Sequence, residues 1–366
     1  MTNSSTSSIS ASNSSTGRRS FGWAGALGLV IAALLIWWAL HDVSAAEVWE
    51  QLRNVRPLPF ALSIVVVTLT FPLRTVRWKY LLRLEGEALP FIPLWHATAI
   101  GFMSTNLLPA RAGEFARAYA ARRLTGVRFT TAFASIAVER VLDGITLVAA
   151  LVVGIWAGGF GTDTAVGDDK TLGSMVRGAG VMFLLLLIIA LAVVHWPQVT
   201  ISVTRSVSQK ILPEGMARGL TSVVEGLVSG LDVLRSPSRF AAAVFWSLVV
   251  WLTGAASFWL AMIAFGLDVP WSAALMLQSL LAFGIAIQFS PGFFGQWEAL
   301  CRLALPALYG VAVGPAVSFA LGFHLGGFFP ITLLGLWSLS RARLHLKDLR
   351  GGKFSEEVGM EQASGT

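Results

Sequence analysis

The chain has 366 residues, of which 55% are hydrophobic and only 13% charged, and its mean hydropathy is +0.69. A soluble protein of this length would carry roughly twice that charge fraction, which excludes the soluble classes. The positive residues behind the net charge of +7 lie mostly in loops. We therefore interpret them as setting the orientation of the chain in the membrane, and not as a nucleic-acid binding surface. The single cysteine excludes an internal disulfide framework.

No sequence motif for catalysis is present. The chain has no Walker sequence, no His-Glu-x-x-His pair, no nucleophile elbow and no Cys/His cluster with metal spacing. We therefore predict that the protein is not an enzyme and uses neither a metal nor another cofactor. His96 and His324 stand in apolar surroundings and are interpreted as core or interfacial histidines.

The first predicted span follows a polar tail. Residues 1–20 are mostly Ser, Thr, Asn and Gly, and we expect a disordered tail because they cannot build a core. Arg18 and Arg19 should keep this tail cytoplasmic. The apolar run 21–40 exceeds the apolar region of a typical signal peptide and is predicted to be an uncleaved span. Five further spans are predicted, at 59–76, 129–157, 178–196, 240–265 and 314–338.

Two further apolar runs, 91–123 and 272–310, are interrupted by proline and glycine. The segments 77–90 and 111–128, which flank the first interruption, are both basic, so both should be cytoplasmic. A complete crossing between them would place one of the two outside. We therefore predict a re-entrant hairpin that enters and leaves on the cytoplasmic side, with its tip at 106–109. Non-helical backbone at that depth must be buried in protein or face water.

Loop charge predicts the orientation of the remaining segments. Acidic residues prevail in 158–177, which should be outside, and basic residues in 197–239, which should be inside. The tail 341–366 begins with basic residues, so we expect it to be cytoplasmic and flexible. Since 314–338 is then the last span, the run 272–310 must begin and end outside. It is predicted to be a second re-entrant hairpin, entering from the opposite face.

The predicted fold is an all-α polytopic membrane protein with six transmembrane helices and two re-entrant hairpins. It occupies residues 21–340, and its halves, 21–157 and 178–338, repeat the same order of elements in opposite orientations. In such inverted repeats, broken helices form the substrate site near the membrane midplane. The segment 214–235 has helical apolar spacing and is predicted to lie along the membrane surface or to pack against the bundle.

The two hairpins share a sequence pattern. An amide residue stands three positions before a proline, a glycine stands four positions after it, and a glutamate follows. Proline and glycine interrupt helices. The residues predicted to break the two hairpins are Pro109, Gly113, Pro291, Gly292 and Gly295.

Polar and charged residues at membrane depth mark the candidate lipid-headgroup site. These residues are Arg74, Arg77, Asn106, Arg111, Glu114, Arg117, Glu139, Arg140, Asp143 and Glu298. Each charge costs about 2.5–3.5 kcal/mol to insert, which requires a partner or water. Arg111, Arg117 and Arg140 would donate to a phosphate-bearing headgroup, with Arg74 and Arg77 at the rim. The acids would orient the arginines; alternatively, they only neutralise them and lock the hairpin.

Four motifs in this order resemble the flippase-like family named after the transmembrane region of lysylphosphatidylglycerol synthase. They are Arg74-x-x-Arg77-Trp78, Pro109-x-Arg111-x-Gly113-Glu114-x-x-Arg117, Glu139-Arg140-x-x-Asp143 and Pro291-Gly292-x-x-Gly295-x-x-Glu298. The resemblance covers about 21–340, and it implies a stand-alone lipid-translocating domain. Phe293 stands where the family usually has glycine. In the synthases a cytosolic aminoacyltransferase domain follows, whereas about 26 residues follow Ser340 here, so lysyl transfer is not expected.

Three functional hypotheses follow. The leading one is a translocator of the cytoplasmic (inner) membrane that moves an anionic or phosphate-linked lipid, such as a polyprenyl lipid or a glycolipid, between leaflets. The alternative is a non-catalytic scaffold for a glycosyl- or aminoacyl-transferase of cell-envelope lipid synthesis, with 214–235 in the docking surface. The third is an intramembrane enzyme that uses Glu114 or Glu139 as a base. The lipid, the direction of movement, the energy source and the oligomeric state are left open.

Overall fold

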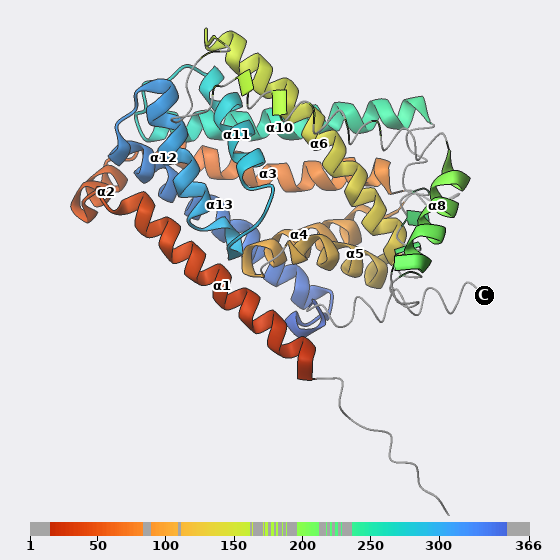
Figure 1. The fold of residues 1–366 in the computed structure, drawn as a ribbon. Coiled ribbons are helices and arrows are strands. Elements are labelled where there is room, and N and C mark those ends of the chain that lie inside the picture. Colours follow the sequence, from red (N-terminus) through yellow and green to blue (C-terminus); the bar gives the residue numbers. More distant parts are fainter. Residues whose placement is uncertain are drawn as a thin grey trace, which may run out of the picture.

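The computed structural model describes residues 15–82, 89–108, 111–161, 196–211 and 236–349, with isolated residues between 163 and 228. These residues form an all-helical bundle (Figure 1). The α-helices are α1 (Ser15–Leu40), α2 (Ala45–Arg53), α3 (Pro57–Leu81), α4 (Phe91–Leu107), α5 (Ala112–Thr125), α6 (Phe129–Ala157), α8 (Pro197–Ile211), α10 (Pro237–Ala264), α11 (Ser272–Gly284), α12 (Gln296–Tyr309) and α13 (Val313–Arg341). Two 3-10 helices are η2 (Pro291–Phe293) and η3 (Leu346–Leu349).

Local sequence explains several helix ends. The hydroxyl of Ser44 accepts a hydrogen bond from the backbone N–H of Glu47 at 3.1 Å and caps α2. Helix α3 starts at Pro57, where the missing N–H costs nothing because the first turn has no partner for it. Helix α5 ends at Gly126, whose φ of 74° is a left-handed conformation that glycine adopts without strain. These local signals determine where α2 and α3 begin and where α5 ends.

The helices pack around two hydrophobic cores. Helices α3 and α10 run side by side, and so do α4 and α5 (Figure 1). The first core gathers residues mainly from α3, α4, α5 and α6, including Trp78 and Ile136. The second gathers residues mainly from α10, α11, α12 and α13, including Met262 and Phe319. The interrupted runs 91–123 and 272–310 therefore pack in two separate hydrophobic cores.

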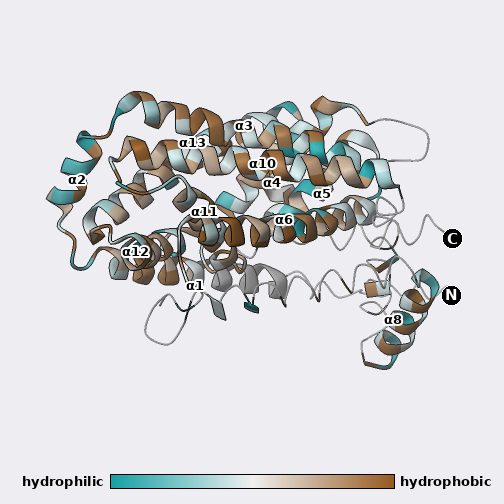
Figure 2. Cartoon of the chain, turned by 90° about the horizontal axis from the view of Figure 1, so that it is seen from above, coloured by the Kyte–Doolittle hydropathy of each residue, from teal (hydrophilic) through white to brown (hydrophobic). Residues whose placement is uncertain are grey.

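Exposed apolar stripes indicate where lipid covers the bundle. On α3, Leu58, Leu62, Val65 and Leu69 follow helical spacing and are between 45% and 69% exposed. A soluble protein rarely exposes such a contiguous apolar surface. Figure 2 shows the same preference for hydrophobic residues along the long helices, whereas α2 carries hydrophilic ones. The protein is a multi-pass integral membrane protein.

The predicted spans 21–40, 59–76, 129–157, 240–265 and 314–338 coincide with helices α1, α3, α6, α10 and α13, but not all of these are long and apolar enough to cross a membrane alone. Among the described residues, three helices, α3, α10 and α13, are long and apolar enough to cross a membrane alone. A fourth crossing results if α1 and α2, which are bent by 82° at their break, count together. The predicted span 129–157 has the bounds of α6. The span 178–196 and the segment 214–235 lie outside the described residues, except for isolated positions.

Candidate functional site

The first interrupted run forms two helices joined by a short break. Helix α4 ends at Leu107 and α5 begins at Ala112. Between them, Arg111 adopts a left-handed backbone with φ 53°. This conformation is uncommon for a residue with a Cβ and costs roughly 1–2 kcal/mol. Pro109, predicted as a helix breaker, lies outside the described residues.

Gly113 has a different role from the one predicted. It lies inside α5 and not in the break. A Cβ added at Gly113 would stand 2.0 Å from the Thr105 hydroxyl and 2.3 Å from the carbonyl oxygen of Gly101 on α4. The prediction that Gly113 breaks the helix is therefore wrong. The absence of a side chain instead lets α5 lie directly against α4.

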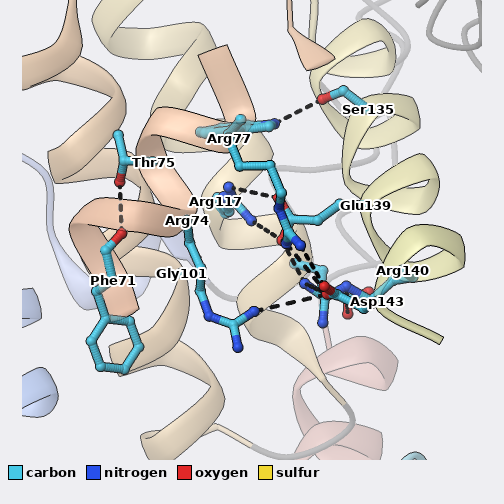
Figure 3. Close-up of polar contacts among 12 residues, drawn as sticks. Phe71, Arg74, Thr75, Arg77, Gly101, Arg117, Ser135, Glu139, Arg140 and Asp143 are labelled. Carbon is cyan, nitrogen blue, oxygen red and sulfur yellow. Dashed lines mark hydrogen bonds and ion pairs between the residues drawn. The ribbon is translucent and has the colours of Figure 1, made fainter. Parts of the chain in front are cut away.

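Two carboxylates on α6 hold arginines from three helices (Figure 3). The guanidinium of Arg117 on α5 forms a bidentate pair with Glu139, at 2.9 and 3.2 Å. Arg77 on α3 lies 3.1 Å from Glu139 and also donates to Asp143. Arg140 on α6 contacts Glu139 at 2.5 Å and Asp143 at 3.2 Å. These five side chains, together with Arg74, Arg111 and Glu114, form the arginine cluster.

Aromatic side chains complete the inner surroundings of the cluster. The indole N–H of Trp251 on α10 donates to Asp143 at 2.8 Å. Arg74 reaches Asp143 at 3.8 Å and lies 5.0 Å from the ring of Trp251. Arg117 lies 3.9 Å from the ring of Trp78. Such cation–π contacts stabilise desolvated guanidinium groups, so four helices fix the positions of these charges.

The cluster is exposed at one edge. The side chains of Arg111, Glu114 and Arg140 are 37%, 29% and 34% exposed. Glu114 lies 3.7 Å from Arg111 and 3.9 Å from Arg140, so it joins the outer arginines to the cluster. Arg77 and Glu139, in contrast, are fully buried. The expectation that Arg77 stands at the rim is wrong, because both carboxylates of α6 draw its guanidinium inward.

The second interrupted run has its break at η2. Pro291 opens this short helix, and Gly292 and Phe293 follow with φ of 60° and 63°. Gly295, with φ 84°, precedes α12, and its N–H donates to the carboxylate of Glu298 at 2.7 Å. Left-handed residues placed in succession turn the chain between α11 and α12.

Glu298 belongs to this hairpin and not to the arginine cluster. Its second oxygen lies 2.7 Å from Nδ1 of His324 on α13. The other ring nitrogen of His324 lies 2.9 Å from the carbonyl oxygen of Gly292. His324 is a buried histidine, as expected, but its partner was missed. The only available signal was that an acid at membrane depth requires a partner.

The tips of the two hairpins bind each other. The oxygen of the Gln288 side chain accepts a hydrogen bond from the N–H of Arg111 at 2.9 Å, and its nitrogen donates to the carbonyl of Thr105 at 2.9 Å. Asn106, predicted to bind a headgroup, donates to the hydroxyl of Thr332 on α13 at 2.9 Å. The two amide residues of the shared pattern thus hold the tips to each other and to α13.

The cluster presents guanidinium donors beside three carboxylates. Within the described ranges, no three His, Cys, Asp or Glu side chains gather as metal ligands would. Planar guanidinium groups bind carboxylate and phosphate oxygens in pairs, as Arg117 binds Glu139. The exposed edge at Arg111 and Arg140 is where such donors can meet an anion.

Comparisons with known proteins cover most of the chain. The family model described as the lysylphosphatidylglycerol synthase TM region matches residues 25–335. A UPF0104 membrane protein of Methanothermobacter thermautotrophicus is 23% identical over 84% of this chain and 89% of its own length. A protein named glycosyltransferase AglD, of Haloferax volcanii, is 26% identical over 81% of this chain, which spans about half (51%) of that relative. The chain belongs to the family of the lysylphosphatidylglycerol synthase transmembrane region.

Proposed function

We propose that this protein is a lipid translocator of the cytoplasmic membrane, and that it binds an anionic or phosphate-linked headgroup at the arginine cluster. One observation carries the proposal. The cluster contains five arginines and three acids, so two of its positive charges are not balanced by acids among the residues that the structure describes. The arginines are Arg74, Arg77, Arg111, Arg117 and Arg140, and the acids are Glu114, Glu139 and Asp143.

An unmatched charge at membrane depth needs a function. Apolar residues of similar volume would pack a helix interface at lower cost than a buried ion pair. The two extra positive charges therefore favour a negatively charged ligand that binds the cluster reversibly. The exposed edge at Arg111 and Arg140 gives such a ligand access, while Arg77 and Arg117 fix the carboxylates from inside. The acyl chains would remain in the bilayer while the headgroup occupies this edge.

We further propose that the fold has six spans and two re-entrant hairpins from opposite faces, with both termini cytoplasmic. The contact between Gln288 and Arg111 supports this, because hairpins that enter from opposite faces would meet at their tips. A topology test can use the single native cysteine. In a Cys301→Ala background, an impermeant maleimide should label Asp163→Cys in intact cells, but Arg123→Cys only after lysis. Labelling of both positions in intact cells would contradict this topology.

Lipid movement is measured in proteoliposomes. Fluorescent phosphatidylglycerol is the probe, and dithionite quenching reports the leaflet that it occupies. We expect the purified protein to accelerate exchange between leaflets and the Arg111→Ala, Arg140→Ala double variant to lose most of this acceleration. The control is Arg205→Ala on α8, which removes an arginine from an exposed pair with Glu225. Unchanged movement in the double variant would remove the arginine cluster from the proposal.

A second candidate is a scaffold for a separate envelope-lipid transferase. The Haloferax volcanii relative favours it, because that protein is named a glycosyltransferase and is about twice as long as the matched region. A scaffold would retain a transferase through mild detergent purification and would leave the fluorescent lipid in its original leaflet. Turnover of a lipid acceptor and a sugar donor by the purified chain alone would instead indicate an enzyme.

A further inference from the structure

The pair formed by Glu298 and His324 lies at the tip of the second hairpin, away from the arginine cluster. Both side chains are buried, with 1% and 9% exposure. Glu298 comes from the first turn of α12, and His324 from the middle of α13. The rings of Phe294 and Trp297 lie 4.7 and 5.1 Å from the imidazole and shield it. Because the pair is buried and shielded, its hydrogen bonds determine how many protons it must hold.

The number of protons follows from the contacts. The carbonyl oxygen of Gly292 can only accept, so the ring nitrogen 2.9 Å away, Nε2, must carry a hydrogen. The 2.7 Å contact between Nδ1 and Glu298 requires one more hydrogen between them. The second carboxylate oxygen already accepts from the N–H of Gly295. The pair therefore holds two protons and no net charge in this conformation.

Loss of one proton breaks one of the two contacts. If Nδ1 gives up the shared proton, its lone pair faces a carboxylate oxygen of Glu298. If the ring keeps a hydrogen on Nδ1 instead, Nε2 faces the carbonyl of Gly292 without one. Either arrangement is repulsive in a buried site. The proton released to water is thus linked to the contact between α13 and the tip of the second hairpin.

We propose that the Glu298–His324 pair is a proton-binding site whose occupancy ties the tip of the second hairpin to α13. Gly292 transmits the change, because a Cβ built there would lie only 3.1 Å from the carbonyl oxygen of Asn106 in the first tip. Release of the shared proton breaks the contact between His324 and Glu298, which loosens the hold of α13 on this tip and on its contact with the first tip. The role in lipid movement rests on the proposed function, whereas the proton site itself does not.

Other titratable groups on the elements packed here leave the pair isolated. Arg302 on α12 is one turn from Glu298, but its guanidinium binds Asp42 and the carbonyl of Ala39. Cys301 is buried on α12, three positions after Glu298. Tyr309, at the far end of α12, donates to the sulfur of Met276. Glu47 beside Gly314, His96 beside Ser338 and Arg341 over the ring of Trp337 lie near the ends of α13.

The variant that tests the site is Glu298→Gln. A glutamine oxygen can accept from the N–H of Gly295 while its amide nitrogen donates to Nδ1 of a neutral imidazole. All three contacts survive with one proton fewer to exchange, so the variant should fold. His324→Gln identifies the His324 signals in the spectrum of the protein labelled with ¹⁵N at its histidines.

The first measurement is ¹⁵N NMR of the full chain in nanodiscs between about pH 6 and pH 9. In the wild type, His324 should show a protonated Nε2 and a proton shared at Nδ1, with the shared proton lost as the pH rises. In Glu298→Gln, Nδ1 should stay unprotonated throughout. Identical His324 signals in both proteins at every pH would overturn the proton site.

The second measurement is the rate of lipid movement over the same pH range. A single proton changes a rate by up to about tenfold per pH unit. We expect such a dependence in the wild type and a flat profile in Glu298→Gln. If both proteins move lipid with the same pH profile, the coupling is overturned and the translocator stands. If the NMR result holds but no lipid moves, the proposed function fails and the proton site stands.

Discussion

The side-chain oxygen of Gln288 lies 2.9 Å from the backbone nitrogen of Arg111 and accepts its hydrogen bond. The amide nitrogen of the same side chain donates to the carbonyls of Thr105 and Leu108, at 2.9 and 3.2 Å. One amide therefore satisfies three backbone groups at a break where the helix cannot satisfy them. It also helps to hold Arg111 in its left-handed conformation, and so orients the exposed edge of the arginine cluster.

Removing this amide should weaken the contact between the tips. In Gln288→Ala, the Arg111 N–H and the Thr105 and Leu108 carbonyls lose their partner, which costs about 1–3 kcal/mol for a buried group left unsatisfied. We expect a clear fall in the apparent Tm of the purified protein in detergent. Gln51→Ala on α2, outside the hairpins, is the control and should leave the Tm nearly unchanged. Equal Tm values for both variants would contradict the role of Gln288.

The inner and outer acids of the arginine cluster should differ in their importance for stability. Glu139→Gln leaves the buried Arg77 and Arg117 without their carboxylate, and breaking a buried pair costs about 3–5 kcal/mol. Glu114→Gln changes an acid that is 29% exposed and at least 3.7 Å from its arginines, so its cost should be about 0–1 kcal/mol. Thermal unfolding and the yield of folded protein compare the two. A similar loss in both variants would contradict the buried position of Glu139.

The sequence predicted the helices better than it predicted the contacts between them. Helix α6 has its predicted bounds, because a helix satisfies its own backbone hydrogen bonds and the apolar length of this one is visible in the sequence. The proline and glycine in the runs 91–123 and 272–310 also indicated that each run is interrupted, and each forms two helices joined by a break, α4 with α5 and α11 with α12. The charged residues at membrane depth identified most of the arginine cluster, since each one requires a partner.

The choice of partners could not be predicted from spacing. Asp143 receives a hydrogen bond from Arg77, 66 positions away, and from Trp251, 108 positions away. Nothing in the sequence near Glu298 indicates that His324, rather than an arginine, will pair with it. Gly113 was assigned to the break because its role depends on how closely α4 approaches α5. Such contacts are set by tertiary packing.

The pair between Asp42 and Arg302 should make stability depend on pH. A hydrogen bond from Arg302 holds the pKa of Asp42, in the turn after α1, below its usual value of about 3.9. A lowered carboxyl pKa stabilises the folded protein above the unfolded pKa, and this contribution is lost as the pH falls through the folded pKa. The wild type should therefore unfold at a higher temperature than Asp42→Asn near neutral pH. The difference should shrink below about pH 4, and a constant difference from pH 7 to pH 3 would contradict the assignment.

A methyl group added to Gly113 should disrupt the first hairpin. Its Cβ would lie 2.0 Å from the Thr105 hydroxyl and 2.3 Å from the Gly101 carbonyl, so α5, which carries Glu114 and Arg117, would have to move away from α4. Overpacking of this kind costs about 1–3 kcal/mol. We expect Gly113→Ala to lower both the apparent Tm and the rate of lipid movement.

Gly327→Ala on α13 is the matched control for this substitution. The nearest atom outside its own helix would be a Val67 methyl group at 3.9 Å, an ordinary van der Waals contact. Alanine favours a helix over glycine by up to about 1 kcal/mol, so this variant should be as stable as the wild type or more stable. If Gly113→Ala were also as stable as the wild type, α4 and α5 would have to lie farther apart than in this structure. The outer arginines would then not be held at the edge of the cluster.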